Sequence, residues 1–198
     1  MSSDREYFNA RAQDWDNTVV HDESKVEHIV NLLQVRASDH ILDVGTGTGV
    51  LIPHLLKYLD DHGHITAVDV SEKMLEVAES KYSGKNITYR LGDVLEMPMD
   101  EKFDVIICFS VFPHFKENKL KAIGTLSQLL NDGGKLCIAH AQSREAINNL
   151  HLKAGDVVKD DRLPKMDILE KSFVDQGLIP ECVIDNENHF IILGKKMN

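Results

Sequence analysis

His40-Ile41-Leu42-Asp43-Val44-Gly45-Thr46-Gly47-Thr48-Gly49 is the stretch that decides the fold of this chain. Its apolar first half is typical of a short buried strand, and residues 50–59, which follow the three glycines, have the pattern of a helix. Glycines at a strand-to-helix turn let the backbone bend sharply and let a ligand approach main-chain atoms, while the helix start offers free N–H groups. The stretch therefore predicts a nucleotide-binding turn after a central strand.

The spacing of the glycines indicates which kind of nucleotide is bound. A dinucleotide fingerprint has the form G-x-G-x-x-G, whereas this chain has G-x-G-x-G followed by Val50. An acidic residue followed by G-x-G-x-G, here Asp43, Gly45, Gly47 and Gly49, resembles the first motif of the class I S-adenosylmethionine-dependent methyltransferases. The resemblance implies a methyltransferase in which this loop, with Thr46, wraps the methionine part of S-adenosyl-L-methionine.

The composition excludes several classes of partner. The chain has 198 residues, which suits one domain, and carries 22 Lys and Arg against 32 Asp and Glu, a formal net charge of −10. We expect no nucleic-acid partner, because such binding depends on neutralising phosphates with clustered basic residues. No apolar run approaches the roughly 20 residues of a membrane span, and the first residues do not form a signal peptide, so we expect a cytoplasmic protein. Cys108, Cys137 and Cys182 are far apart, which favours buried thiols over a disulfide framework or a zinc site.

Two acidic residues downstream are the predicted contacts for the sugar and the base of the cofactor. Asp69 ends the strand expected at 65–70, where a carboxylate can accept hydrogen bonds from both ribose hydroxyls. The alternative is a turn or cap role, but Ser71 is the better cap for the helix expected at 72–81 and leaves the Asp69 carboxylate free. Gly92-Asp93-Val94 is an ordinary turn when taken alone, yet its place after the strand expected at 86–91 resembles the family's adenine motif. The complete set predicted to bind the cofactor is Asp43, Gly45, Thr46, Gly47, Gly49, Asp69, Val70, Met74, Gly92, Asp93, Val94 and Phe109.

The N-terminal segment has two possible roles. Residues 4–16 are helix-forming and place Phe8, Ala12 and Trp15 on one face. They form a terminal helix packed on the core, or part of a segment, residues 1–22, that resembles the family's N-terminal lid, and both can hold at once. In the second case Tyr7 and Trp15 are expected to contact the substrate. The next helix, expected at 23–34, belongs to the scaffold.

The loop after the strand expected at 102–110 is the first that can face a substrate. It holds Phe112 and His114 and lacks the N-P-P-Y or D-P-P-Y motif of many nitrogen methyltransferases. The resemblance therefore favours a small-molecule acceptor over adenine or glutamine. A helix expected at 118–130, with Leu120 buried, leads through a turn at 131–134 to a strand at 135–140 that ends at His140.

Residues 141–165 are predicted to form an insertion on the substrate side. Ser143 can cap a helix that places Arg144, Asn148 and His151 on one face, where they either orient a substrate or form an ordinary surface stripe. The pattern R-E-x-x-N-x-x-H in this helix resembles a branch of small methyltransferases, some of them associated with corrinoid proteins.

The last part of the chain completes the predicted fold. A helix is expected at 166–176, followed by strands at 181–185 and 189–193 whose short connection forces an antiparallel pair. The family resemblance implies a single α/β domain over residues 1–198, a three-layer Rossmann-like doubly wound sheet. Its seven strands should follow the order 3-2-1-4-5-7-6, with strand 7 antiparallel.

The implied reaction is direct in-line methyl transfer to a small-molecule acceptor, giving S-adenosylhomocysteine. The protein would hold the nucleophile, exclude water and take up a proton. His114, His140 and His151 are the candidate bases, although a His at a strand end is often simply hydrogen-bonded in place. The alternatives are a non-catalytic protein that binds the cofactor or a partner, an NAD-dependent oxidoreductase, and a metal site of His140, Glu145 and His151. The acceptor and the oligomeric state stay open, a dimer being one possibility.

Overall fold

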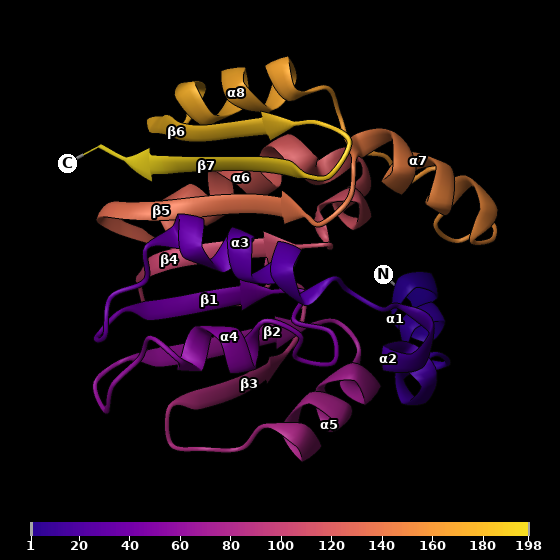
Figure 1. Ribbon diagram of the computed structural model, residues 1–198, viewed down its shortest axis with the longest axis horizontal. Coiled ribbons are helices and arrows are strands. Elements are labelled where there is room, and N and C mark those ends of the chain that lie inside the picture. The colour runs from indigo at the N-terminus through magenta and orange to yellow at the C-terminus, as the bar shows by residue number, and fades with distance from the viewer. Residues whose placement is uncertain (1, 198) are drawn as a thin grey trace.

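The computed structural model describes residues 2–197, and a seven-stranded sheet organises them (Figure 1). The strand order is β3-β2-β1-β4-β5-β7-β6, as predicted, and β7 runs antiparallel to both β5 and β6. All the other neighbouring strands pair in parallel. The strands are β1 (His40–Val44), β2 (His64–Asp69), β3 (Ile87–Leu91), β4 (Phe103–Phe109), β5 (Leu130–His140), β6 (Leu178–Asp185) and β7 (Phe190–Lys196).

Helices cover both faces of this sheet, so the central strands are apolar on both sides. Ile106 of β4 belongs to the core beneath α6 (Lys119–Gln128) and α8 (Met166–Asp175), and its neighbour Ile107 belongs to the core beneath α3 (Glu23–Leu33) and α4 (Ile52–Leu56). This alternation follows from the two-residue period of a strand. It makes the sheet a rigid platform for the loops at its carboxyl edge.

Two predicted helices differ from the structure. The helix expected at 50–59 is only α4, because residues 50 and 51 lie in turns and Pro53 suits only the first helical turn. The single helix expected at 4–16 is broken into α1 (Ser2–Asn9), a 3₁₀ turn (Ala12–Asp14) and α2 (Trp15–Thr18). At the break, the Asn9 side chain accepts hydrogen bonds from Ser71 and from the backbone of Lys73, a use that competes with helix continuation.

Other differences are local. Leu120 was expected in the core but is 51% exposed, because α6 presents Ala122, Ile123 and Leu126 to the sheet instead. The turn expected at 131–134 is part of β5, where the pairing with β4 shifts register between Phe103 and Val105. Cys108 and Cys137 are buried as free thiols, whereas Cys182 is only half-buried.

No helix within residues 2–197 has both the length and the apolar character needed to cross a membrane.

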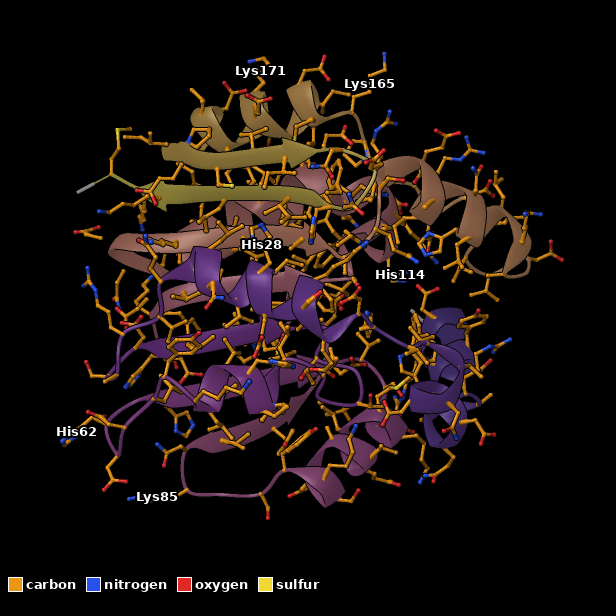
Figure 2. All side chains as sticks on the ribbon, viewed as in Figure 1. His28, His62, Lys85, His114, Lys165 and Lys171 are labelled. Carbon is orange, nitrogen blue, oxygen red and sulfur yellow. The ribbon has the colours of Figure 1, made fainter. Side chains whose placement is uncertain are left out.

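The parallel strands all end at one edge of the sheet. In Figure 1, α1, α2 and α7 (Arg144–Lys153) lie at that edge, and α5 (Glu72–Lys81) flanks β2 and β3. Figure 2 shows His114 at the same edge, with His62 and Lys85 at the opposite one. The loops after several strands therefore meet the N-terminal helices α1 and α2 and the helix α7 at this edge of the sheet.

Candidate active site

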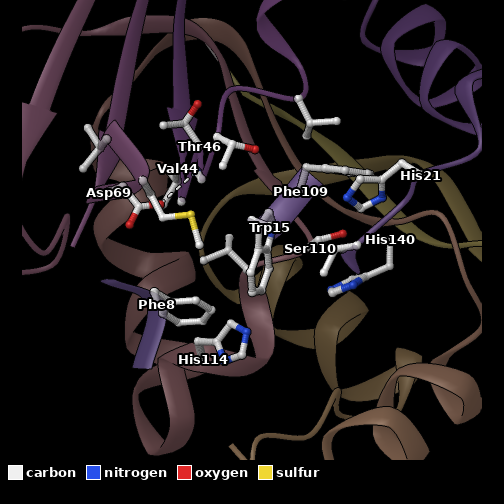
Figure 3. Close-up of a pocket in the computed structure, with 18 of the residues that line it drawn as sticks. Phe8, Trp15, His21, Val44, Thr46, Asp69, Phe109, Ser110, His114 and His140 are labelled. Atoms are coloured by element: carbon white, nitrogen blue, oxygen red, sulfur yellow. Dashed lines mark hydrogen bonds between the residues drawn. The ribbon is translucent and has the colours of Figure 1, made fainter. Parts of the chain in front are cut away.

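A cavity of about 650 Å³ lies at this edge (Figure 3). The loops after β1 to β5 line it, together with the N-terminal segment and α7. Of the residues predicted to bind a cofactor, those in the lining are Gly45, Thr46, Gly47, Asp69, Val70, Met74, Gly92, Asp93, Val94 and Phe109. One cavity thus collects residues from the carboxyl ends of four consecutive strands, β1 to β4, and from the loops that follow them.

The glycine turn has a backbone that other residues adopt only with strain. Gly45 and Gly47 have φ values of +67° and +55°. A Cβ on Gly45 would lie 2.3 Å from Cγ2 of Val111, whereas a Cβ on Gly47 would have no atom within 4 Å. Gly45 is therefore needed for close packing of two loops, and Gly47 leaves open space on the cavity side.

Asp43 acts behind this turn, outside the cavity lining. Its carboxylate is buried and accepts a 2.7 Å hydrogen bond from the Thr46 hydroxyl, which holds the turn against β1. Burial raises the pKa of Asp43 to about 7. Gly49 also lies outside the lining, packed near Ile52 and Tyr82.

Asp69 joins the end of β2 to the glycine turn. One carboxylate oxygen accepts a 2.9 Å hydrogen bond from the Gly47 N–H, and the other accepts a 2.8 Å bond from the Ser71 N–H. Ser71 caps α5 as predicted, by accepting from the Met74 N–H at 3.1 Å. The carboxylate is thus engaged with two backbone groups and not free as expected, but two oxygens offer about four acceptor positions and leave capacity for a ligand. Burial raises the pKa of Asp69.

The N-terminal segment closes one side of the cavity. Phe8 and Trp15 both line it, and their rings meet edge to face with centroids 5.7 Å apart. Asp16 ties this segment to the body of the protein by accepting hydrogen bonds from the Thr48 hydroxyl and, at 2.6 Å, from the Lys81 ammonium. Tyr7, the other residue predicted to contact a substrate, points elsewhere and donates to the Ala154 carbonyl at 3.3 Å.

The three histidines predicted as candidate bases, His114, His140 and His151, all line the cavity. The Nδ1 atom of His114 lies 2.7 Å from an oxygen of the Asp161 carboxylate, and Nδ1 of His151 lies 2.6 Å from the Asp161 backbone carbonyl. The rings of His114 and His151 are 5.1 Å apart. His140 is 1% exposed, and neither of its ring nitrogens has a hydrogen-bond partner within residues 2–197. Burial lowers the pKa of His140 to about 3, so it is neutral at physiological pH.

Three other predicted substrate residues lie outside the cavity lining. Phe112 is fully buried in the core. The Arg144 guanidinium lies 3.5 Å from the Asp185 carboxylate, and Asn148 exchanges hydrogen bonds with the Leu163 backbone. These contacts hold α7 in place, and a substrate role for the three residues stays a prediction.

The structure also bears on the metal alternative and on what the motifs missed. Among the side chains described, no three His, Cys, Asp or Glu come together as metal ligands, and the site of His140, Glu145 and His151 is not formed.

Asp161 is 2% exposed in a loop that the sequence presents as a run of charged residues. Its importance comes from a contact with His114 across 47 residues, for which no local pattern exists.

Comparisons with known proteins agree with this geometry. A family model described as a methyltransferase domain matches residues 41–134. The malonyl-[acyl-carrier protein] O-methyltransferase of Bacillus cereus is 30% identical over 148 residues, which are 73% of this chain and 54% of that protein. The ubiquinone biosynthesis O-methyltransferase of Coxiella burnetii is 32% identical over 141 residues, which are 65% of this chain and 57% of that protein. The chain spans about half the length of these curated relatives.

The fold has a close counterpart among solved structures. A chain from the complex between the Haloferax volcanii Trm112 methyltransferase activator and a methyltransferase matches with a TM-score of 0.80. Identity is 16%, over 100% of this chain and 98% of that chain. The family match over the glycine turn, the order of the sheet and the acidic G-x-G-x-G motif agree, and they make this chain similar to the class I S-adenosylmethionine-dependent methyltransferases.

Proposed function

We propose that this chain binds S-adenosyl-L-methionine in the cavity and transfers its methyl group to a small-molecule acceptor. The observation that carries the proposal is the buried carboxylate of Asp69, held at the end of β2 beside the open face of Gly47. A carboxylate there suits a ribose diol, because it can accept both hydroxyl protons in charge-assisted hydrogen bonds.

The other lining residues fit the same ligand. Asp93 and the Val94 N–H suit the adenine edge, and Met74, which is buried in the cavity wall, suits its face. The charged side chains of the lining are mostly acidic, which favours a ligand that carries a sulfonium cation. They are Asp4, Asp16, Glu23, Asp69 and Asp93 against Lys57 and Lys81.

The cofactor supplies an activated methyl group, so the residues of this chain need to position and shield the acceptor. Phe8 and Trp15 form an apolar wall that keeps water from the space between the N-terminal segment and the histidines. Holding an acceptor there, next to the cofactor, replaces a bimolecular encounter by a preorganised one. His114, His140 and His151 are the candidate groups for taking up a proton, and His21 and His54 also line the cavity.

The acceptor is proposed only as a small molecule at this point. The relatives named above carry O-methyltransferase names, which supports an oxygen acceptor and not a nucleic acid. None of them is described as corrinoid-associated, so that narrower resemblance stays a prediction. The binding partner that we propose, besides the cofactor, is therefore the acceptor itself.

Binding and turnover are tested separately. Calorimetric titration with S-adenosylhomocysteine should give saturable heat at micromolar concentrations, and Asp69→Ala should weaken it about 100-fold, from two charge-assisted hydrogen bonds of roughly 1.5 kcal/mol or more each. Asp132→Ala, an exposed carboxylate at the far end of β5, is the matched control and should bind normally. Transfer of an isotope-labelled methyl group to a metabolite extract then distinguishes an enzyme from a protein that only binds the cofactor. Absence of binding by the unmodified chain would reject the proposal.

A further inference from the structure

His114 is held by a buried carboxylate in a way that leaves one ring nitrogen for a ligand. Its Nδ1 atom is 2.7 Å from Oδ2 of Asp161, whose side chain is 3% exposed. Because a carboxylate only accepts, Nδ1 of His114 carries the proton, and in the neutral ring Nε2 is then an acceptor. His114 lines the cavity and Asp161 does not, so Asp161 lies behind the ring and fixes its orientation.

The surroundings of this pair argue against an anionic acceptor. A carboxylate or phosphate acceptor needs no proton acceptor and calls for an unpaired cation in the wall. The two lysines of the described lining are both engaged, Lys57 with Glu27 at 2.9 Å and Lys81 with Asp16 at 2.6 Å. An anionic acceptor would need a positive counter-charge at this place. The cavity instead offers a base, His114.

The charges behind the pair argue against an ammonium acceptor. Lys119 is half-buried and acts electrostatically on Asp161, as does Lys116, which pairs with Asp4 at 2.8 Å. Asp4 compensates the charge of Lys116, so Lys119 is the cation that disfavours a second positive group on this side, such as an amine acceptor protonated at neutral pH. The titratable and charged groups around His114 are Asp4, Asp69, Lys116, Glu117, Lys119, His140, His151 and Asp161.

The walls around His114 suit a flat aromatic body. The ring of Phe8 packs edge to face against the ring of His114, with centroids 5.1 Å apart, and against the ring of Trp15, with centroids 5.7 Å apart. Figure 3 shows Phe8 beside His114 at the cavity. The acidity of the acceptor's hydroxyl group narrows the choice of acceptor further. A phenol, with a pKa near 10, gives up its proton to an imidazole more readily than an aliphatic alcohol does, whose pKa is close to the roughly 15.7 of water.

We propose, on the basis of the function proposed above, that the acceptor is a neutral phenol and that His114, oriented by Asp161, takes its proton. The phenolic O–H bond breaks and its proton passes to Nε2 of His114. The phenolic oxygen forms a bond to the methyl carbon while the S–CH₃ bond breaks, and that electron pair stays on sulfur. The net positive charge moves from the sulfonium to the imidazolium, which the Asp161 carboxylate stabilises before the proton leaves to solvent.

His140 has a separate part in this arrangement. Its two ring nitrogens are buried without partners among residues 2–197, and a neutral imidazole there has one donor and one acceptor to offer. A second polar group on the aromatic ring, such as a neighbouring hydroxyl, would satisfy it. Catechols should therefore be better acceptors than simple phenols.

The test compares acceptors and variants in one assay of S-adenosylhomocysteine formation. The acceptors are catechol, 4-methylphenol and 4-nitrophenol, with benzyl alcohol, benzoate and 4-methylaniline as the other chemical classes. We expect methylation of the phenols, catechol above 4-methylphenol, and none of the last three. Asp161→Asn should lower kcat for 4-methylphenol roughly 100-fold with KM changed less than 3-fold, whereas 4-nitrophenol, which ionises without help near neutral pH, should lose less than 10-fold.

A pH profile separates a positioning role from a structural one. With 4-methylphenol, the deficit of Asp161→Asn should shrink as the pH approaches 10, because the phenol then ionises by itself. His114→Gln should be as impaired as Asp161→Asn, and the double variant no worse than His114→Gln alone. Asp160→Asn, at the exposed neighbouring residue, is the matched control and should behave as the unmodified chain.

Each outcome decides a different statement. Normal affinity for S-adenosylhomocysteine without methylation of any phenol, or a preference for benzoate or 4-methylaniline, would overturn the phenol assignment and leave cofactor binding intact. An equal loss for 4-methylphenol and 4-nitrophenol at all pH values would overturn the role of Asp161. Loss of cofactor binding by the unmodified chain would instead reject the function on which this proposal rests.

Discussion

Replacing Gly45 and Gly47 by alanine should lower stability to different extents, although both glycines have positive φ. The shared cost is that of a left-handed backbone with a Cβ, about 1–2 kcal/mol. Gly45→Ala adds a steric overlap, because the new Cβ would lie 2.3 Å from Cγ2 and 2.6 Å from Cβ of Val111. Overpacking of this kind typically costs a further 1–3 kcal/mol. Gly45→Ala should therefore lower the free energy of unfolding by about 1–3 kcal/mol more than Gly47→Ala does.

Urea unfolding at constant pH measures this difference, and a second substitution tests its cause. Val111→Gly removes both overlapping atoms, so Gly45→Ala and Val111→Gly together should cost about 1–3 kcal/mol less than the sum of the single changes. Gly47→Ala should spare the fold but weaken S-adenosylhomocysteine, because its Cβ would occupy open space beside the cavity. Equal unfolding free energies for the two alanine variants, or an additive double variant, would refute the close-approach argument.

Three further predictions concern groups around the same cavity. Asp43 has a pKa of about 7 in the folded chain and an ordinary, lower pKa when unfolded, so between about pH 4 and 7 the unfolded state releases its proton first and stability falls as pH rises. Over that window the free energy of unfolding should drop by up to about 4 kcal/mol, and urea titrations of Asp43→Asn should show a smaller drop. The same pH dependence of the free energy of unfolding in Asp43→Asn and in the unmodified chain would contradict this. Asp16→Ala should speed the dissociation of S-adenosylhomocysteine roughly 3-fold in stopped-flow measurements that follow Trp15 fluorescence, because it frees the N-terminal segment from Thr48 and Lys81. Asp14→Ala, with no such contacts in the described structure, is its control. His140→Leu should raise the free energy of unfolding by about 1–2 kcal/mol, because it removes a buried imidazole without partners, while acceptor turnover falls; a less stable variant would mean that the His140 ring nitrogens are satisfied after all.

The cofactor half of the site is predictable because its information is local. Gly45, Asp69 and Asp93 each follow a strand in the sequence, and parallel strands bring their carboxyl ends to one edge whatever the rest of the chain does. The sheet order follows from the same repeated unit. What escapes prediction there is fine detail, such as the bond between Asp69 and the Gly47 N–H, which crosses between two loops.

The helix boundaries show a second kind of limit. Residues 4–16 have an uninterrupted helical pattern, but Asn9 finds better partners at the cap of α5 than in its own helix. Leu120 fits the apolar stripe of α6 in sequence, yet it lies on the side of α6 that faces away from the sheet and is half exposed. In each case a tertiary contact, or the lack of one, outweighs a local preference of a few tenths to one kcal/mol.

The half that we propose for the acceptor is built in a different way, from contacts that the motifs do not reveal. Arg144 and Asn148 have the right chemistry for a substrate, but a helix face shows only which residues share a direction and not what that direction meets. His114 depends on Asp161, which lies 47 residues away, and the wall opposite it comes from Phe8 at the other end of the chain. Because these contacts join loops that the sheet does not constrain, substitutions in residues 155–164 or in the N-terminal segment can change the acceptor without disturbing the glycine turn. The cavity therefore joins a half determined by the fold to a half determined by its loops, and we propose that the second half selects the acceptor.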